Sequence, residues 1–175
     1  MLIISKQAKI SKLADIEDSV RGSKIVIEKN VAIDSFVKIK PIGGAGDIVI
    51  GENSRINAGT VLFSGNGIQI GENVLISPCC VLAPVNHEYR DKAKAIILQG
   101  FMPSRGGIKI GDDVWIGANS TILDGAIIGQ GVAIGANSLV KGKLKPYCVY
   151  AGNPLKQIGR RNIDISSQQY YRRLE

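Results

Sequence analysis

Residues 108–140 read IKIGDDVWIGANSTILDGAIIGQGVAIGANSLV, and an aliphatic side chain returns in this segment at every sixth position. The repeating residues are Ile110, Ile116, Ile122, Ile128, Ile134 and Val140. Glycine follows four of them, and a small or β-branched residue lies two positions before each of the last five, at Val114, Ser120, Ala126, Val132 and Ser138. Because an α-helix repeats every 3.6 residues and a strand every two, neither element alone produces a strict period of six.

A period of six belongs to a chain that makes a short strand, turns a corner and repeats. Three such units close a triangular coil of about 18 residues, which is the unit of a parallel β-helix. The aliphatic and the small residue point into the coil, while Gly, Asn and Asp between them suit corners with a left-handed backbone. A β-sandwich with apolar strands is the alternative, but a sandwich does not keep one register over the whole segment. We therefore predict an all-β chain folded as a parallel β-helix.

The same spacing extends towards the N-terminus and defines five coils. Their inward aliphatic residues are Ile27, Ile33 and Ile39; Ile50, Ile56 and Leu62; Ile70, Ile76 and Leu82; Ile110, Ile116 and Ile122; and Ile128, Ile134 and Val140. Three of the four steps between coils exceed six residues, by 5, 2 and 22 residues. All the extra residues follow the third hexad of a coil, so we expect them at one corner of the triangle. Loops stacked at one corner form a composite surface, the usual place for function on a repeat scaffold.

The two ends of the chain are less regular. Residues 1–24 are predicted to form an N-terminal cap over the open strand edges, with Ile10 and Ile16 in an irregular first turn. The β-helix domain is expected over 25–146, with a loop inserted at 84–107. Residues 147–175 form a C-terminal extension, in which Ser166 is expected to cap a short helix that runs to Leu174.

The composition excludes several classes of protein. Four apolar residues at the N-terminus are too few for a signal peptide, and no apolar run approaches a membrane span, so a cytoplasmic location is expected. Three cysteines show no metal-ligand spacing, which fits a reducing compartment. Residues 141–175 hold +6 of the net charge of +7, with eight basic residues against two acidic ones. No aromatic platform accompanies this basic region, which favours a polyanionic small molecule over nucleic acid as its ligand.

A single histidine, His87, lies five residues after Leu82, at the start of the longest insertion. An isolated loop histidine is usually a surface residue, but this one lies at the corner where function is expected. A neutral imidazole titrates near physiological pH and accepts a proton from a hydroxyl or an amine. One histidine also excludes a three-histidine zinc site, and we predict no metal site in this protein.

The repeat segment resembles the hexapeptide-repeat acyltransferases. The resemblance rests on residues 108–140 and on VYAGNPLKQI at 149–158, which is similar to the segment that ends the repeat domain of that family. It covers about residues 25–160 and points to the branch of the galactoside and maltose O-acetyltransferases and the capsule or O-antigen O-acetyltransferases. The resemblance implies a left-handed β-helix, acetyl-CoA as the acyl donor, and a homotrimer with each site in a groove between two subunits.

The resemblance also implies roles for individual residues. His87, at the end of ISPCCVLAPVNH (76–87), matches the histidine that acts as the catalytic base. Asn57, at the end of IGENSRIN (50–57), matches an acceptor contact, and Asn86 beside His87 is assigned to the acceptor as well. Trp115 matches the tryptophan of the family's VWIG motif, which lines the active-site tunnel and contacts both substrates. The acetyl-CoA contacts are expected at Trp115, Ala118 and Ala136 for the pantetheine arm, and at Lys141, Lys156 and Arg160 for the nucleotide end.

We therefore expect an acetyl-CoA-dependent O-acetyltransferase that transfers the acetyl group directly to a hydroxyl of a sugar or polysaccharide precursor, with His87 as the general base. No serine triad or activated cysteine is visible, which favours direct attack over an acyl-enzyme. The galactoside and maltose enzymes have a longer helical N-terminal segment with an acidic acceptor contact, for which Asp15, Glu17 or Asp18 are the candidates here. Two alternatives stay open: an N-acetyltransferase of an amino sugar or antibiotic-type acceptor, and a non-catalytic β-helix scaffold.

Overall fold

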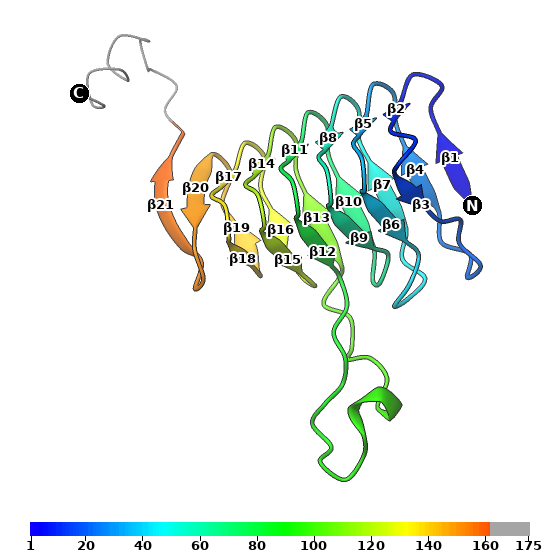
Figure 1. The fold of residues 1–175 in the computed structure, drawn as a ribbon. Helices are drawn as coiled ribbons and strands as arrows, with labels where there is room; N and C mark the ends of the chain where they lie inside the picture. Colours follow the sequence, from blue (N-terminus) through cyan, green and yellow to red (C-terminus); the bar gives the residue numbers. More distant parts are fainter. Residues whose placement is uncertain (162–175) are drawn as a thin grey trace.

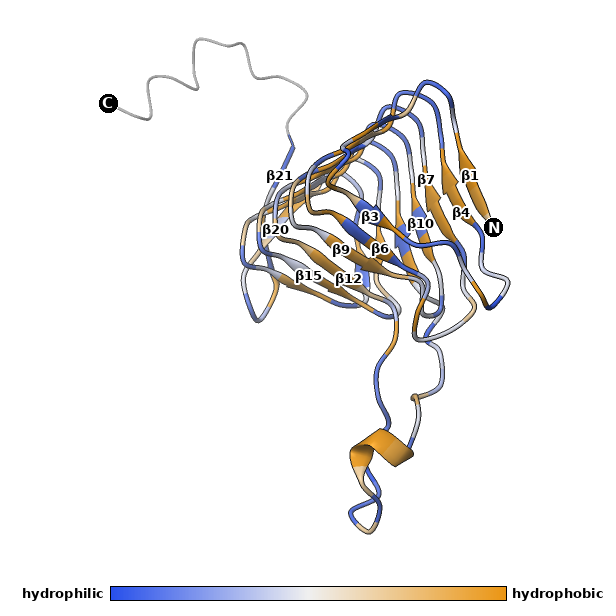
Figure 2. Cartoon of the chain, turned by 45° about the vertical axis from the view of Figure 1, so that its right-hand side comes forward, coloured by the Kyte–Doolittle hydropathy of each residue, from blue (hydrophilic) through white to orange (hydrophobic). Residues whose placement is uncertain are grey.

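The computed structural model describes residues 1–161, and the helix expected from Ser166 to Leu174 lies outside them. The chain winds through short strands that stack into three sheets, and these sheets form the sides of a triangular prism (Figures 1 and 2). We call them sheets A, B and C in the order in which the chain meets them. Pairing is parallel throughout, except for the last strand of sheet B.

The strands of each sheet come from successive coils. Sheet A contains β1 (Leu2–Ile4), β4 (Ile25–Ile27), β7 (Ile48–Ile50), β10 (Ile68–Ile70), β13 (Ile108–Ile110), β16 (Ile127–Ile128) and β19 (Lys143–Leu144). Sheet B contains β2 (Lys9–Ile10), β5 (Ala32–Ile33), β8 (Arg55–Ile56), β11 (Leu75–Ile76), β14 (Trp115–Ile116), β17 (Ala133–Ile134), β20 (Cys148–Ala151) and β21 (Lys156–Arg160). Sheet C contains β3 (Asp15–Ile16), β6 (Lys38–Lys40), β9 (Val61–Phe63), β12 (Val81–Ala83), β15 (Thr121–Leu123) and β18 (Leu139–Val140).

The predicted register is confirmed in all five coils. Each inward aliphatic residue named from the spacing is at most 3% exposed. Equivalent residues lie one above the other, as in sheet B, where Ile116 pairs with Ile76 on one side and Ile134 on the other. The core is therefore a column of stacked aliphatic side chains, and their removal from water holds the coils together. This architecture is the left-handed parallel β-helix that the resemblance implies.

The corners between the sheets adopt a left-handed backbone, as the Asn and Gly pattern predicts. Asn119 and Asn137 have φ angles of 60° and 56°, and the side-chain amide of Asn119 donates a hydrogen bond to that of Asn137 at 2.6 Å. Three residues that disfavour positive φ take the same conformation, namely Phe36, Cys79 and Tyr147. Such a conformation costs on the order of 1–3 kcal/mol outside glycine. The repeat geometry therefore outweighs local preference at these three corners.

The N-terminal segment is more regular than the irregular cap that the sequence predicts. Its three strands, β1, β2 and β3, pair in parallel with β4, β5 and β6 and complete a full coil. Ile4, Ile10 and Ile16 take the inward positions but stay partly exposed, because no coil covers them on one side. They are themselves spaced by six, and residues 17–24 then make one more insertion after a third hexad. The end of the core is thus covered by a coil of the β-helix itself.

The β-helix also continues past Pro146, where the hexad spacing stops. Leu144 and Tyr150 occupy the next inward positions, at 7% and 8% exposure, and β19 and β20 pair with β16 and β17. The spacing misses this coil because Leu144 follows Val140 by four residues instead of six. β21 then turns back and pairs antiparallel with β20, which covers the last edge of sheet B.

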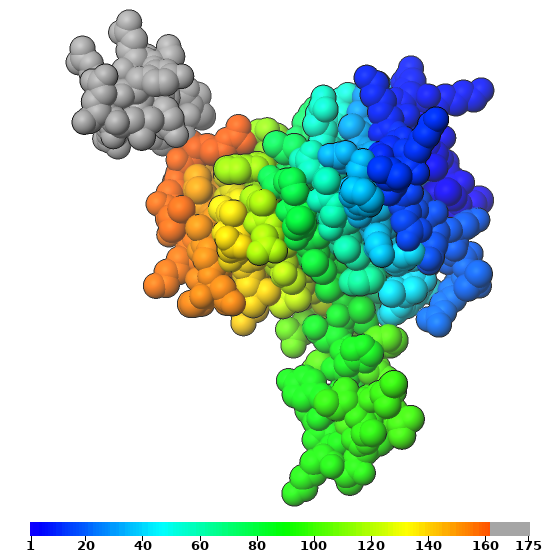
Figure 3. All heavy atoms as spheres, viewed as in Figure 1, coloured from blue at the N-terminus to red at the C-terminus, as the bar shows by residue number. Residues whose placement is uncertain are grey.

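The insertions between coils lie at one corner, between sheets C and A, as the spacing predicts. Those after coils one, two and three span 41–47, 64–67 and 84–107. Their backbones contact one another, since Gly65 N–H donates to the Ile42 carbonyl at 2.9 Å and Asn66 N–H to the Pro84 carbonyl at 3.1 Å. The longest, which we call the long loop, extends away from the prism and carries the 3₁₀ helix η1 (Ile96–Leu98) (Figures 1 and 3). Within residues 1–161, no helix is long and apolar enough to cross a bilayer.

Candidate active site

The long loop leaves the prism along an outgoing limb (84–88) and comes back along a returning limb (100–107). His87 lies on the outgoing limb, four residues after the end of β12. The returning limb runs beside it, because His87 forms an antiparallel bridge with Phe101 and the Met102 N–H donates to the Asn86 carbonyl at 2.9 Å. The centroids of the imidazole and the Phe101 ring are 4.9 Å apart, and the rings are tilted by 39°. The paired limbs and this aromatic contact therefore orient an imidazole that is otherwise exposed.

Two cavities share His87. One has a volume of about 520 Å³ and is lined by both limbs of the long loop, through Asn86, His87, Tyr89, Ile96, Met102 and Arg105. The other has a volume of about 370 Å³, and its lining includes Phe63, Val85, His87 and Phe101. The first cavity presents amide, phenol and guanidinium groups, whereas the second is apolar apart from the imidazole. The His87 imidazole thus borders a polar cavity on one side and an apolar cavity on the other.

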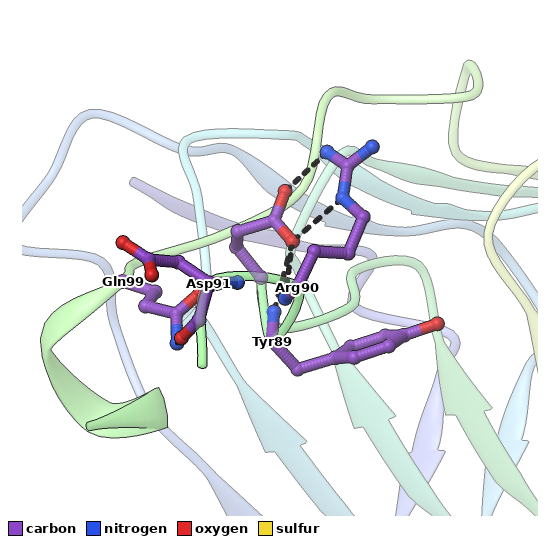
Figure 4. Close-up of polar contacts among 5 residues, drawn as sticks. Tyr89, Arg90, Asp91 and Gln99 are labelled. Atoms are coloured by element: carbon purple, nitrogen blue, oxygen red, sulfur yellow. Dashed lines mark hydrogen bonds and ion pairs between the residues drawn. The ribbon is translucent and has the colours of Figure 1, made fainter. Parts of the chain in front are cut away.

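The part of the loop beyond His87 is held by its own polar contacts (Figure 4). Glu88 forms an ion pair with Arg90 and accepts the backbone N–H groups of Tyr89 and Arg90 at 2.9 and 3.0 Å. The hydrogen bond from the Arg90 guanidinium is the main reason why the pKa of Glu88 falls to about 2. Gln99 donates to the carbonyl of Asp91 at 2.8 Å and accepts the Asp91 N–H at 3.1 Å. These bonds give the loop a defined shape, with the apolar η1 exposed on its outer part beside a polar turn (Figure 2).

The other two predicted acceptor contacts lie elsewhere on the prism. Asn57 directly follows β8 of sheet B, and its side-chain amide donates to the Ile76 carbonyl at 2.8 Å. Trp115, in β14 of the same sheet, is 47% exposed and donates its indole N–H to Ser77 Oγ at 3.0 Å. Neither residue lines a cavity at His87. Because sheet B lies opposite the corner between sheets C and A, a single subunit brings Asn86 to His87 but not Asn57 or Trp115.

The predicted acetyl-CoA contacts are also divided. Ala118 and Ala136 follow β14 and β17 at the corner between sheets B and C, where the Asn137 N–H donates to the Ala118 carbonyl at 2.9 Å. Lys156 shares this corner through its pairing with Ala151, whereas Arg160 opposes Cys148 at the far end of the same strands. Lys141 follows β18 at the corner of the long loop. All three cations are exposed, and one subunit does not gather them around a single groove.

The structure adds residues that the hexad spacing does not indicate. Phe101 and Met102 reach His87 from the returning limb, and Arg105 lines the polar cavity. Asp124, at a corner of the repeat, is 4% exposed and accepts three N–H groups where the long loop leaves the prism. Their contacts join segments far apart in sequence, so no local pattern predicts them. Among residues 1–161, no group of three His, Cys, Asp or Glu side chains is arranged to hold a metal ion.

Comparison with known sequences identifies the repeat. Residues 107–142 match the family described as bacterial transferase hexapeptide (six repeats). The galactoside O-acetyltransferase of Escherichia coli K12 is 34% identical over 129 residues, which are 71% of this chain and 59% of that protein. The putative lipopolysaccharide biosynthesis O-acetyl transferase WbbJ of the same strain is 32% identical over 124 residues, 68% of this chain and 63% of WbbJ. The chain thus spans less than two thirds of the length of either relative.

Comparison with solved structures extends the likeness to almost the whole chain. A structure of AntD, an N-acyltransferase from Bacillus cereus, in complex with dTDP and coenzyme A superposes with a TM-score of 0.76 at 28% identity, covering 97% of this chain and 89% of AntD. Another AntD structure, with dTDP-4-amino-4,6-dideoxyglucose and coenzyme A, has a TM-score of 0.77 at 27% identity and covers 98% and 90%. The matched repeat, the β-helix and these relatives together show that residues 107–142 carry the bacterial transferase hexapeptide repeat and that the chain is similar to the hexapeptide-repeat acyltransferases.

Proposed function

We propose that the protein is an acetyl-CoA-dependent acetyltransferase that acts on a hydroxyl of a sugar or polysaccharide precursor, with His87 as the general base. The place of His87 carries this proposal. The one histidine of the chain lies near the start of the long loop and borders two cavities of different polarity. A general base must reach the nucleophile while the acyl donor occupies a neighbouring site. Two cavities that share one imidazole meet that requirement.

The proposed reaction is a direct transfer. The neutral imidazole accepts the proton of the acceptor hydroxyl while its oxygen attacks the thioester carbonyl, and backbone N–H groups stabilise the oxyanion that forms. The tetrahedral intermediate then collapses with cleavage of the C–S bond, and the thiolate of coenzyme A takes the proton from the imidazolium. A cysteine acyl-enzyme is not needed for this sequence of steps. Burial also raises the pKa of the Cys80 thiol, which opposes a thiolate nucleophile there.

The complete site, in this proposal, needs a second subunit. Asn57 and Trp115 lie on sheet B and His87 at the opposite corner, so they meet only across an interface. In a homotrimer with sheet B of one subunit beside the long loop of the next, Trp115 and Asn57 of one subunit face His87 of its neighbour. The 47% exposure of Trp115 supports this arrangement, because a large aromatic side chain on a flat sheet is a favourable surface for a partner.

Acetyl-CoA is the proposed donor, and its binding region follows from the small and cationic residues. Ala118 and Ala136 leave the corner between sheets B and C free of bulky side chains, so that an extended pantetheine arm can approach the backbone. Lys156 lies at the same corner and supplies positive charge for phosphates. Lys141 and Arg160 extend the positive charge along the C-terminal coils. The use of coenzyme A by AntD supports the donor assignment.

The likeness to AntD favours a second candidate, N-acyl transfer to the amino group of a nucleotide-linked amino sugar. It covers more of both chains than the likeness to the O-acetyltransferases does. A neutral imidazole can serve an amine as well as a hydroxyl. A panel of acceptors with matched hydroxyl and amino sugars, free and nucleotide-linked, separates the two candidates by the product formed. An antibiotic-type acceptor belongs in the same panel, since a chloramphenicol acetyltransferase of Agrobacterium fabrum is 34% identical over 127 residues.

Donor binding is the first experiment. Calorimetric titration with acetyl-CoA at low salt should show saturable binding near one site per subunit. Absence of binding would refute both enzymatic candidates and favour a non-catalytic scaffold.

The role of His87 is tested next by the release of free coenzyme A in the presence of an acceptor. His87→Ala should lower kcat by about 10²–10⁴-fold, the usual contribution of a general base, while acetyl-CoA affinity stays nearly unchanged. Lys92→Ala, at an exposed site on the same loop, is the matched control and should keep full turnover. Unchanged turnover of His87→Ala would refute the assignment of His87 as the general base.

A further inference from the structure

A buried carboxylate lies where both limbs of the long loop leave the prism. Asp124 follows β15 and is 4% exposed. Its Oδ2 accepts the Arg105 N–H at 2.8 Å and its Oδ1 accepts the Gly107 N–H at 2.9 Å, both on the returning limb. The side-chain amide of Asn66 donates to Oδ2 at 3.2 Å. Three N–H donors thus compensate a charge that would otherwise be costly to bury.

Asn66 ties the same carboxylate to the outgoing limb. While its side chain binds Asp124, its backbone N–H donates to the Pro84 carbonyl at 3.1 Å. Pro84 lies three residues before His87. The pair Asp124 and Asn66, which we call the neck clamp, therefore holds the first residue of the outgoing limb and the last residues of the returning limb.

The region where the long loop joins the prism, which we call the neck, is closely packed and leaves little room for the two limbs to shift. A Cβ on Gly107, whose φ is +74°, would lie 2.5 Å from the Gly67 carbonyl oxygen. A Cβ on Gly125 would lie 2.8 Å from Cβ of Arg105, and one on Gly65 would lie 2.9 Å from the Pro84 carbonyl oxygen. Each limb thus rests directly on the backbone of a neighbouring coil, so the polar clamp acts on segments that are already in contact.

The position of His87 depends on how these two limbs are placed relative to each other. Its imidazole packs on Phe101, and the preceding residue accepts the Met102 N–H, so the outgoing and returning limbs orient it together. We propose that Asp124, with Asn66, is a positioning residue that aims the His87 imidazole by clamping the two limbs of the long loop at the prism. This inference rests on the proposed function, because it assigns the clamp to the base of that reaction.

The chemistry of the clamp requires a carboxylate. Two oxygens must accept N–H groups from different directions, whereas an asparagine at the same place offers one acceptor oxygen and turns an NH₂ group towards an N–H donor. Asp124→Asn keeps the size of the side chain but breaks one of the two bonds to the returning limb. A displacement of about 1 Å of a catalytic group can cost on the order of 10²-fold in rate.

The test compares Asp124→Asn with Asp112→Asn in turnover and in hydrogen–deuterium exchange. Asp112 is a suitable control, because its carboxylate also accepts a backbone N–H, that of Glu72 at 2.9 Å, at a different corner. Asp124→Asn should lower kcat by about 10- to 100-fold, with the KM for acetyl-CoA changed less than about twofold. Exchange should accelerate in 84–88 and 100–107, while the control variant alters neither quantity.

A double variant separates positioning from general loss of structure. If Asp124 acts through His87, adding Asp124→Asn to His87→Ala should cause no further loss of the residual turnover. An equal additional loss in both backgrounds would overturn the inference. Asn66→Ala, which keeps the backbone bond to Pro84, provides a milder variant should Asp124→Asn fold poorly, and should shift exchange in the same segments.

The failure of this inference differs from the failure of the proposed function. Unchanged exchange at the neck in both Asp124→Asn and Asn66→Ala would refute the clamp even if His87 is essential. Full turnover of His87→Ala would refute the proposed base, and with it the positioning role, whatever the exchange shows.

Discussion

Mixed trimers of two variants, each expected to lack most of its turnover alone, test directly whether the site is shared between subunits. His87→Ala removes the proposed base at the corner of the long loop, and Trp115→Ala removes the exposed ring on sheet B. If each site takes His87 from one subunit and Trp115 from the next, a mixed trimer of these variants contains one site with both residues intact. We expect such trimers to show about one third of the wild-type turnover per trimer.

The magnitude follows from counting the junctions in a ring of three. Whether the two variants combine in a ratio of two to one or one to two, the ring has one junction at which an intact His87 meets an intact Trp115. Random assembly from equal amounts makes about three quarters of the trimers mixed, so an unselected preparation should recover about one quarter of the wild-type turnover. A site built within one subunit would recover nothing beyond the residual activity of the single variants.

Co-expression with two different affinity tags and purification on both selects the mixed trimers, and release of coenzyme A measures their turnover. Trimers that carry both tags on His87→Ala alone are the control for residual activity. The reasoning is refuted if trimers confirmed as mixed by native mass spectrometry are no more active than this control.

Three further predictions concern the donor, the loop and the core. Lys141→Ala combined with Lys156→Ala should raise the KM for acetyl-CoA and make it more sensitive to salt, because screening weakens the remaining attraction of the phosphates; a change in kcat alone would show that these cations are wrongly placed. The Glu88 carboxyl should titrate with a pKa of about 2 in a ¹³C NMR experiment, and Arg90→Ala should return that pKa towards 4.5. Because the folded pKa is lowered, the stabilisation by Glu88 is complete above about pH 4.5 and is lost as the pH falls towards about 2, so loop protection in hydrogen exchange should decline over that window. In the core, Ile116→Ala should lower the free energy of unfolding by about 2–5 kcal/mol and Ile116→Val by about 0.5–1.5 kcal/mol, measured by urea denaturation at fixed protein concentration; equal effects of the two changes would contradict the tight packing of the column.

Much of the fold could be predicted from the spacing alone. The inward residues of five coils, the three-sided coil and the single corner for the insertions follow from a period of six, because side-chain direction in a β-helix is set by position within the hexad. The first and last coils were harder to predict for identifiable reasons. Charged or polar residues flank Ile10 and Ile16, Ile4 belongs to an apolar run at the N-terminus, and the step from Val140 to Leu144 is two residues short.

The candidate site divides in the same way. Sequence places His87 at the functional corner and Asn86 beside it, because both are neighbours along the chain and follow a hexad of known register. The spacing also places Trp115 on one side of the prism. Whether that side lies near His87 depends on how the three sheets are arranged in space, which the spacing does not give.

The sequence therefore carries the repeat, its register and the corner that bears the loops, since these depend on residues close together in the chain. Only the tertiary structure reveals the neck clamp and the separation of sheet B from His87. Asp124 contacts Asn66 and Arg105 because stacking of the coils brings distant segments within hydrogen-bonding distance. Such contacts depend on the three-dimensional path of the chain, so a local pattern of residue types does not predict them.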